Sequence, residues 1–229
     1  SHETCRVFSD RLINADDRKW FLEQVKTQTQ ACFSRPYSAV VTAKDGELMY
    51  CDFFTAGHDP TIYEEVTALD KLADLMHEHL NEYNEQAIPM NLVLFEDAMR
   101  HVCRISRIIE SSGGHALMVG VGGMGKQSLA RLATFVNGYS AFQVVITARY
   151  GVNDLKADLQ TMYRKAGLKQ EGISFIFTDQ QIADERFLVF MNDLLSSGNI
   201  PGLFPVEDQD DIINNIRPAV KRAGLPDTR

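Results

Sequence analysis

The chain has 229 residues, which is enough for one large domain or two small ones. Apolar residues make up 45% and charged residues 24%, the ordinary balance of a globular protein. The net charge of −8 argues against a nucleic-acid binder, which would carry a basic face. No apolar run approaches the roughly 18 residues that a membrane span requires. We therefore expect neither nucleic acid nor membrane among its partners.

The spacing of cysteine and histidine does not indicate a disulfide framework or a metal site. The four cysteines are widely scattered, with no Cys-x-x-Cys pair, so we interpret them as reduced intracellular thiols. His77 and His79 lie two residues apart on a predicted helix and so point away from each other, which argues against a metal pair. The cysteines are Cys5, Cys32, Cys51 and Cys103.

The first part of the chain, residues 1–87, is predicted to be a small, mainly helical subdomain with a β-hairpin. Apolar residues recur at helical spacing from the start and are interrupted near residues 14–17. Asp45-Gly46 favours a tight turn between two β-rich stretches. The elements expected here are helices within 3–33 and at 61–83, and strands at 36–41 and 47–54.

Residues 88–229 show a different pattern, after a linker at 84–90 in which Pro89 ends the preceding helix. Short, nearly continuous apolar stretches alternate with helical ones, which is typical of a parallel sheet covered by helices. We predict an α/β fold with a parallel sheet flanked by helices. Since the chain opens in a helical pattern and stops at a polar turn, we also expect a piece of a longer protein. The expected strands are 115–121, 142–148 and 173–179, and the expected helices are 95–109, 128–138, 153–166, 185–197 and 208–223.

Residues 120–128 read GVGGMGKQS, and the spacing Gly-x-x-x-x-Gly-Lys is that of a phosphate-binding loop. Glycines let the backbone wrap closely around an anion, the following helix presents its N–H groups, and a lysine supplies charge for the outer phosphates. An apolar stretch before the loop and an amphipathic helix after it complete the pattern. We predict nucleotide binding by Gly120, Val121, Gly122, Gly123, Met124, Gly125, Lys126, Gln127 and Ser128.

The positions that usually hold Mg²⁺ depart from the pattern. Gln127 stands where a Ser or Thr hydroxyl is expected, and Ser128 lies about 100° further round the helix. Two acids are expected after the last predicted strand, but the sequence reads Thr178-Asp179-Gln180. Either Asp179 is the metal acid and Gln180 replaces the catalytic base, or Thr178 replaces the metal acid and Asp179 is the base. The loop is thus expected to hold phosphates while binding Mg²⁺ weakly, through Gln127, Thr178 and Asp179.

Several stretches together resemble the fourth AAA+ module of dynein heavy chains. They are GVGGMGKQSLARLATFV, LKADLQTMYRKAG, TDQQIADERFLVFMNDLLSSGNIPGLF and MNLVLFEDAMRHVCRISRII. The Gly-Lys-Gln-Ser variant and the Thr-Asp pair are more similar to axonemal than to cytoplasmic heavy chains. The opening HETCRVFSDRL resembles the lid subdomain of the preceding, third module, so the resemblance covers essentially the whole chain. The glycine loop alone is weakly specific, but together with NDLLSSGNIPGLF it is strong.

The resemblance implies a segment of the motor ring of an axonemal dynein heavy chain, an ATP-driven, minus-end-directed microtubule motor of cilia and flagella. Residues 1–87 would be the lid of the third module, and 88–229 the large P-loop subdomain of the fourth. The ungapped match puts Thr178 at the metal-acid position and Asp179 at the catalytic-acid position. Arg6 would be the lid arginine that reaches the third module's own nucleotide. The residues implied to pack on the adenine are Leu92, Val93 and Leu94.

The implied cofactors are ATP or ADP, with Mg²⁺ weakly held. The implied partners are the adjacent AAA+ modules of the same heavy chain and, through the parent protein, microtubules and dynein intermediate and light chains. The implied location is the cytoplasm and cytoskeleton, in the axoneme of the cilium. Three roles stay open for the module: a regulatory nucleotide site with little hydrolysis, an active ATPase, or a structural ring segment with an empty pocket. A small-molecule P-loop kinase is disfavoured, since acceptor-binding acids and lid arginines are not recognisable.

Overall fold

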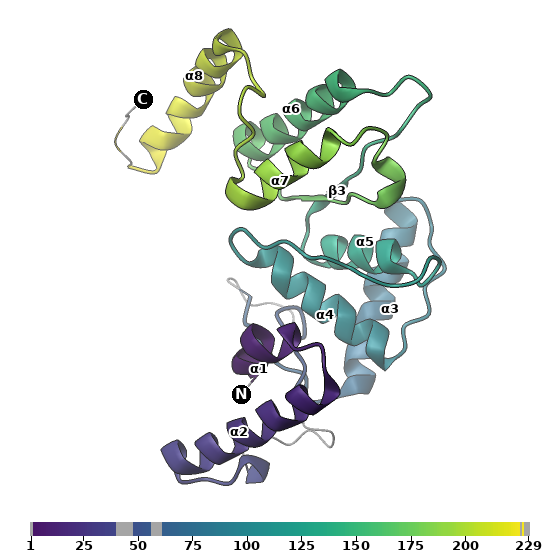
Figure 1. The fold of residues 1–229 in the computed structure, drawn as a ribbon, viewed down its shortest axis with the longest axis vertical. Coiled ribbons are helices and arrows are strands. Elements are labelled where there is room, and N and C mark those ends of the chain that lie inside the picture. The colour runs from purple at the N-terminus through teal and green to yellow at the C-terminus, as the bar shows by residue number, and fades with distance from the viewer. Residues whose placement is uncertain (1, 40–47, 56–60, 225, 227–229) are drawn as a thin grey trace. The chain divides into compact units, whose positions relative to one another are not determined.

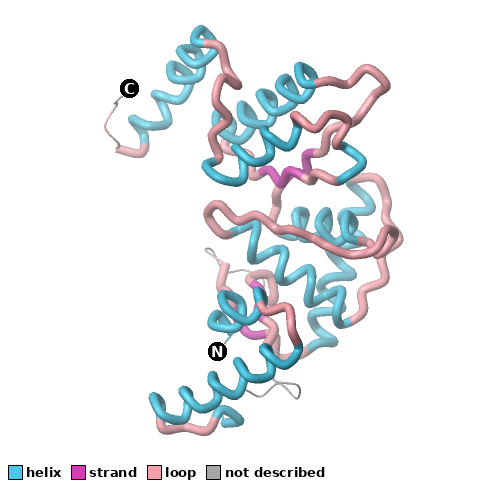
Figure 2. The backbone as a smooth tube through the Cα atoms, in the orientation of Figure 1, coloured by secondary structure: helices cyan, strands magenta, loops and turns pink. Residues whose placement is uncertain are grey.

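A computed structural model of the chain divides into two compact units, residues 1–75 (unit 1) and residues 76–229 (unit 2). Helices dominate both units, and the strands are short (Figure 2). Across the part of the chain that the structure describes, no helix is both long enough and apolar enough to span a bilayer. The described residues are 2–39, 48–55, 61–224 and 226.

Unit 1 is helical and contains one antiparallel strand pair. The predicted interruption near residues 14–17 is confirmed, because a short helix and a 3₁₀ turn precede a long helix that begins at Ala15. Its elements are α1 (His2–Phe8), η1 (Ser9–Arg11), α2 (Ala15–Phe33), η2 (Tyr37–Ala39), β1 (Tyr50–Cys51), β2 (Glu64–Glu65) and the first part of α3 (Leu69–Gln86), which continues into unit 2.

The strand pair of unit 1 differs from the predicted hairpin. Residues 37–39 of the first predicted strand form η2, and the second is reduced to β1, whose partner is β2. The predicted turn at 45–46 lies outside the described residues. Strand pairing also shortens the helix predicted at 61–83, because the backbone around β2 bonds β1 instead of a helical turn, with Val66 N donating to Met49 O at 2.9 Å.

The side chain of His2 ties α1 to this strand pair. Its Nδ1 bonds the carbonyl of Leu48 at 3.1 Å, and its Nε2 bonds the hydroxyl of Tyr63 at 2.8 Å. The imidazole ring also stacks on Tyr50, with the ring centroids 4.3 Å apart. The start of the chain is therefore held to the strands by polar and aromatic contacts together.

The helices predicted for unit 2 are confirmed, with ends that differ by a few residues. Glycines mark two of these ends: Gly125 (φ +74°) immediately precedes one helix and Gly198 (φ +68°) follows another. Both lie in the left-handed region, which glycine adopts without a steric penalty. The helices are α4 (Glu96–Glu110), α5 (Lys126–Val136), α6 (Val152–Lys169), α7 (Phe187–Ser197) and α8 (Val206–Arg222).

The parallel sheet of unit 2 is shorter than predicted. β3 (Ser140–Phe142) and β4 (Ile173–Phe175) pair in parallel, which confirms the predicted arrangement of these two regions. The backbone stays extended beyond the ladder, and Ile176 N donates to Phe142 O at 2.8 Å. The carboxyl ends of both strands thus lie side by side, which is the edge where the predicted site residues follow.

The strand predicted at 115–121 is not formed. The structure assigns these residues to no strand, and Leu117 and Val119 are 91% and 86% exposed. The apolar pattern predicted burial, but a strand also needs a neighbouring backbone to bond. Within the described residues, no strand is hydrogen-bonded to this segment.

The first core of unit 2 lies between α4 and α5. Ser106 Oγ donates to Asn137 Oδ1 at 2.5 Å, and Asn137 Nδ2 donates to the Ser106 carbonyl at 3.1 Å. Ser106 is fully buried, so these bonds are shielded from water. Because Asn137 caps the end of α5, the pair fixes this helix on α4 and so positions the loop at its other end. The buried apolar residues here are Met99, Val102, Ile105, Leu129, Leu132 and Ala133.

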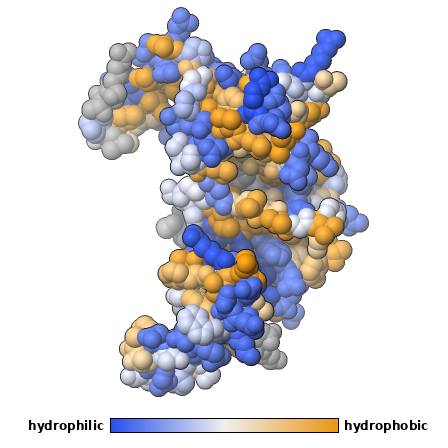
Figure 3. All heavy atoms as spheres, viewed as in Figure 1, coloured by the Kyte–Doolittle hydropathy of each residue, from blue (hydrophilic) through white to orange (hydrophobic). Residues whose placement is uncertain are grey.

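A second core joins α6 and α7 beside β3 (Figure 1). Val144, just after β3, is buried together with Leu155 and Leu159 of α6 and Phe187 of α7. On the face drawn in Figure 3, apolar residues show among hydrophilic ones in this part of unit 2, in keeping with the exposure of Leu188 on α7. The helix α7 therefore buries one apolar face in the core and leaves other apolar side chains exposed.

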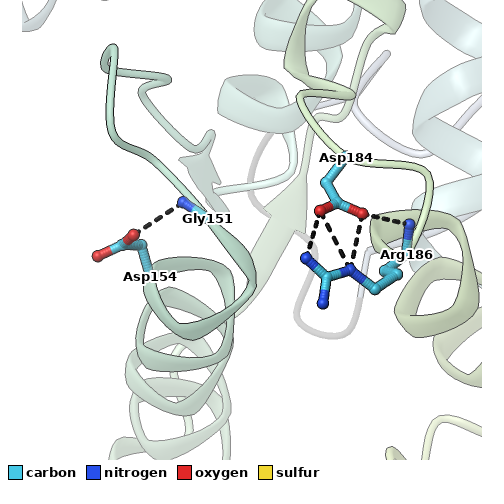
Figure 4. Close-up of polar contacts among 4 residues, drawn as sticks. All are labelled: Gly151, Asp154, Asp184 and Arg186. Atoms are coloured by element: carbon cyan, nitrogen blue, oxygen red, sulfur yellow. Dashed lines mark hydrogen bonds and ion pairs between the residues drawn. The ribbon is translucent and has the colours of Figure 1, made fainter.

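Two local turns set where α6 and α7 begin (Figure 4). The carboxylate of Asp154 accepts a hydrogen bond from the N–H of Gly151 at 2.8 Å, which caps the first turn of α6. Asp184 accepts from the side chain of Arg186, with the Nη2–Oδ2 distance 2.6 Å, and from its backbone N–H at 2.8 Å. These bonds, chiefly those from the guanidinium, lower the pKa of Asp184 to about 2.

Replacing Asn137 by alanine is expected to destabilise the protein by about 1–3 kcal/mol, because the buried Ser106 hydroxyl loses its partner. Chemical denaturation followed by circular dichroism measures the change. Asn215 bonds the Asp211 carbonyl on the surface of α8, so Asn215→Ala is the matched control and should change stability by less than about 0.5 kcal/mol. An equal, small loss in both variants would contradict the role given to Asn137.

The carboxyl of Asp184 is expected to titrate near pH 2 in the folded protein, below its usual pKa of 3.8. Because the folded-state pKa is lowered, the ion pair stabilises the fold above about pH 4, and this contribution is lost as the pH falls toward 2. Arg186→Met should raise the midpoint toward 3.8. Carboxyl NMR titration measures both proteins, and an unchanged midpoint in the variant would show that Arg186 does not set it.

Candidate functional site

The loop before α5 has a backbone suited to an anion. Gly123 and Gly125 have φ values of +81° and +74°, which favour glycine. A Cβ atom added to Gly122 or Gly123 would meet nothing within 4 Å among the described residues, so this side of the loop is open. Gly125 is the N-cap of α5, and because glycine has no side chain it cannot cap the first turn of the helix. The N–H groups in the first turn of a helix lack intrahelical partners, so those of α5 are available to a ligand.

The side chain of Lys126 folds back onto the loop that precedes α5. Its Nζ donates to the carbonyls of Gly120 at 2.6 Å and Val121 at 2.8 Å. The aliphatic part of the side chain folds over Gly120, where an added Cβ would lie 3.6 Å from Lys126 Cδ and 3.9 Å from Met124 Sδ. Two of the three ammonium N–H bonds serve the loop, and the third can be donated to an anion. Phosphate is such an anion.

The three apolar residues implied to pack on the adenine are placed differently from one another. Leu92 is half-buried, and its Cδ1 lies 3.6 Å from where a Cβ on Gly125 would stand, so it reaches the loop. Val93 is 73% exposed, whereas Leu94 is buried with 9% exposure. The structure thus brings Leu92 to the loop and leaves the surface of Val93 open to a ligand.

Gln127, in the first turn of α5, is exposed, and its side-chain amide contacts a residue of another segment. Its Oε1 accepts a hydrogen bond from Gln143 Nε2 at 3.4 Å. Gln143 Oε1 in turn accepts from Arg131 Nη2, on the next turn of α5. Ser128 is half-buried and lies about 100° further round the helix. The amide that replaces the usual hydroxyl is therefore engaged with protein groups.

Thr178 and Asp179 follow β4 and begin a short 3₁₀ turn, η3 (Asp179–Gln181). The buried side chain of Gln181 accepts from Thr178 N at 2.8 Å and from Thr178 Oγ1 at 3.4 Å. It also donates through Nε2 to the Val144 carbonyl at 2.6 Å, which links the ends of the two strands. Asp179 and Gln180 are exposed.

The residues Gln181, Gln143 and Arg131 were not among the predicted site residues. A signal for Gln181 was present, because Thr-x-x-Gln is the spacing of a capping box. For the other two the sequence holds no such signal, since Gln143 lies 16 residues from Gln127 and 12 from Arg131. Their role depends on which segments pack together.

The oxygen atoms expected to hold Mg²⁺ either contact other protein groups or lie exposed. Mg²⁺ requires oxygen ligands in nearly ideal octahedral geometry. The Gln127 oxygen is held by Gln143, the Thr178 hydroxyl is directed to Gln181, and Asp179 is an exposed carboxylate. Among the described residues, no group of three or more His, Cys, Asp or Glu side chains could hold a metal ion.

Arg6, implied by the resemblance, and His79, whose spacing from His77 argued against a metal pair, lie away from the loop in the sequence. Arg6, in α1, forms an ion pair with Asp10 at 3.2 Å, and its side chain is 9% exposed. His79 Nδ1 lies 3.6 Å from the carboxylate of Glu82 on the same helix. Neither contact involves a residue of the loop.

Comparison with known proteins identifies the family. A family model described as the P-loop containing dynein motor region D4 matches residues 90–229. The flagellar outer-arm dynein alpha chain of Chlamydomonas reinhardtii is 48% identical over 229 residues, and the ciliary dynein beta chain of Tripneustes gratilla is 47% identical over 228. Dynein axonemal heavy chain 17 of Homo sapiens is 44% identical over 228 residues.

These alignments cover 99–100% of this chain but 5% of each relative. The resemblance to axonemal dynein heavy chains is confirmed by them, and the α/β P-loop class is confirmed by the family match. The matched region contains the glycine loop, α5, the parallel strand pair and α6 to α8. The chain therefore belongs to the P-loop containing dynein motor region D4 family, with axonemal dynein heavy chains as its relatives.

Proposed function

We propose that this chain binds adenine nucleotide at residues 120–128. The observation that carries the proposal is the position of Lys126, whose ammonium sits between two loop carbonyls at the start of α5 with one N–H bond to spare. The open face at Gly122 and Gly123 gives phosphates room to approach the backbone. Leu92 and Val93 offer apolar surface to a base beside the loop.

We further propose that the site regulates a dynein motor ring and hydrolyses little ATP itself. The support is chemical: the donors expected for Mg²⁺ are poorly arranged, and Asp179 carries one methylene fewer than the glutamate that usually orients water. An arginine from a neighbouring module would also be needed, and such a residue is worth about 10³–10⁵ in rate. The site then acts by holding nucleotide and so favouring one conformation of the ring.

The wider setting follows from the relatives. By analogy with axonemal dynein heavy chains, the chain works within an ATP-driven microtubule motor in the axoneme of the cilium, part of the cytoskeleton. Its direct partners are then the adjacent AAA+ modules of the same heavy chain. Microtubules and the intermediate and light chains are reached through the parent protein.

Residues 1–87 are proposed to be the lid of the preceding module rather than a cover for this loop. Two facts support this: an AAA+ lid follows its own glycine loop along the chain, and the family match begins at residue 90. The boundary between the two structural units falls earlier, between residues 75 and 76, within α3. The part of α3 after this boundary belongs to unit 2, where Tyr83 packs edge-on against Phe135 of α5 with the ring centroids 5.5 Å apart. Under this proposal Arg6 serves the nucleotide of the preceding module.

Lys126→Ala is expected to weaken ADP binding about 30-fold, or about 2 kcal/mol, because a charge-assisted hydrogen bond to phosphate is lost. Isothermal titration calorimetry of the purified chain measures the affinity. Lys169→Ala removes a surface lysine and should leave it unchanged, as should Arg6→Ala if the first 87 residues serve another module. Absence of ADP binding to the unaltered chain would favour the structural role.

Steady-state ATP turnover by the purified chain is expected to stay below roughly 10⁻² s⁻¹, since the arginine from a neighbour and a well-held metal are both needed for fast phosphoryl transfer. Phosphate release measures the rate, and Lys126→Ala should not change it. A rate near 1 s⁻¹ that Lys126→Ala abolishes would instead establish an active ATPase module.

A further inference from the structure

Three side chains form a hydrogen-bonded row along α5. Gln127 and Arg131 are four residues apart on this helix and so lie on the same face. The side chain of Gln143, from the segment after β3, lies across that face and bonds both of them. The row begins one residue after Lys126, the phosphate-binding lysine of the proposed site.

The direction of these bonds is fixed by Arg131. A guanidinium has only donors, so the group of Gln143 that faces it must be the carbonyl oxygen. The amide nitrogen of Gln143 must then face Gln127, whose own carbonyl oxygen has to accept from it. A permanent cation at one end of the row thus sets the polarity of the hydrogen bond that the side-chain oxygen of Gln127 accepts.

We propose that Arg131 and Gln143 make this nucleotide site selective for metal-free nucleoside di- or triphosphate over its Mg²⁺ complex. The proposal rests on the proposed nucleotide binding at Lys126. It assigns Arg131 and Gln143 a positioning role: they hold the Gln127 amide in a protein hydrogen bond.

The positive charges at the start of α5 also favour the metal-free nucleotide. Lys126 and Arg131 place two cations on the first two turns of α5, where the dipole of the helix is already positive. The carboxylate expected near the metal, Asp179, is exposed and lies in the turn after β4. A metal-free nucleotide carries two more negative charges than its Mg²⁺ complex, so this surface favours the free form.

The test compares ADP affinity in excess EDTA with ADP affinity in saturating Mg²⁺, by calorimetry on the whole purified chain. The unaltered protein should bind free ADP at least about tenfold more tightly, because Mg²⁺ would be repelled by Lys126 and Arg131 and would gain no oxygen ligand from Gln127. Electron paramagnetic resonance of Mn²⁺–ADP gives an independent reading. Binding should release Mn²⁺ to solution rather than immobilise it.

Two variants test the named residues. Gln143→Met keeps the size of the side chain but breaks the row, and Arg131→Leu also removes the cation. In both variants, the ratio of the affinity for free ADP to the affinity for Mg²⁺–ADP should fall toward one. The amount of Mn²⁺ that stays bound together with nucleotide should increase. Gln160→Met and Arg164→Leu, on α6, are matched controls that lose a similar side chain elsewhere and should keep the original preference.

The outcomes separate the two proposals. No ADP binding with or without metal removes the nucleotide site, and this inference with it. Equal or tighter binding of Mg²⁺–ADP by the unaltered protein overturns the selectivity while leaving the nucleotide site in place. An unchanged preference in both variants, with melting temperatures showing that they are folded, overturns the role of Arg131 and Gln143.

Discussion

Successive side chains of an extended backbone point in opposite directions, and the two residues after β3 use this alternation to join the halves of unit 2. Val144 buries its side chain against α6 and α7, while Gln143 reaches Gln127 on α5. The carbonyl of Val144 accepts from Gln181, which also holds Thr178. A shift of one residue would exchange the core face and the site face, so the register of β3 with β4 determines the chemistry beside the loop.

In the proposed site, the groups that would bind phosphate are different from those that would bind a metal ion. In the proposed site, phosphate would bind backbone N–H groups and Lys126, and these need only the glycine loop and the start of α5. Metal binding would need oxygen atoms from two segments at once, and the oxygens of Gln127 and Thr178 both point to protein groups. Under the proposed function, such a site would retain nucleotide and turn it over slowly, which suits a regulatory module within a ring of related modules.

Local signals located the helices well because a helix is made of consecutive residues. The 3.6-residue apolar period and glycines such as Gly125 and Gly198 mark its course and its ends without reference to distant segments. Strands were predicted less well, since a ladder requires a second backbone. The apolar run around Leu117 predicted a buried strand, but the described residues supply no partner for it. In unit 1, the partner of β1 among the described residues is β2, which comes after it in the chain.

The glycine loop, its lysine and the family could be recognised from the sequence alone, because each of these depends on neighbouring residues in a fixed order. The same order of residues predicted a poor match to a magnesium site. The hydrogen-bond partner of the Gln127 side chain became visible only in the folded structure. Its partner Gln143 is 16 residues away, and the polarity of their hydrogen bond is set by Arg131 on a different segment from Gln143. Hydrogen bonds between side chains on separate elements depend on packing and register, and these leave no pattern in a single sequence.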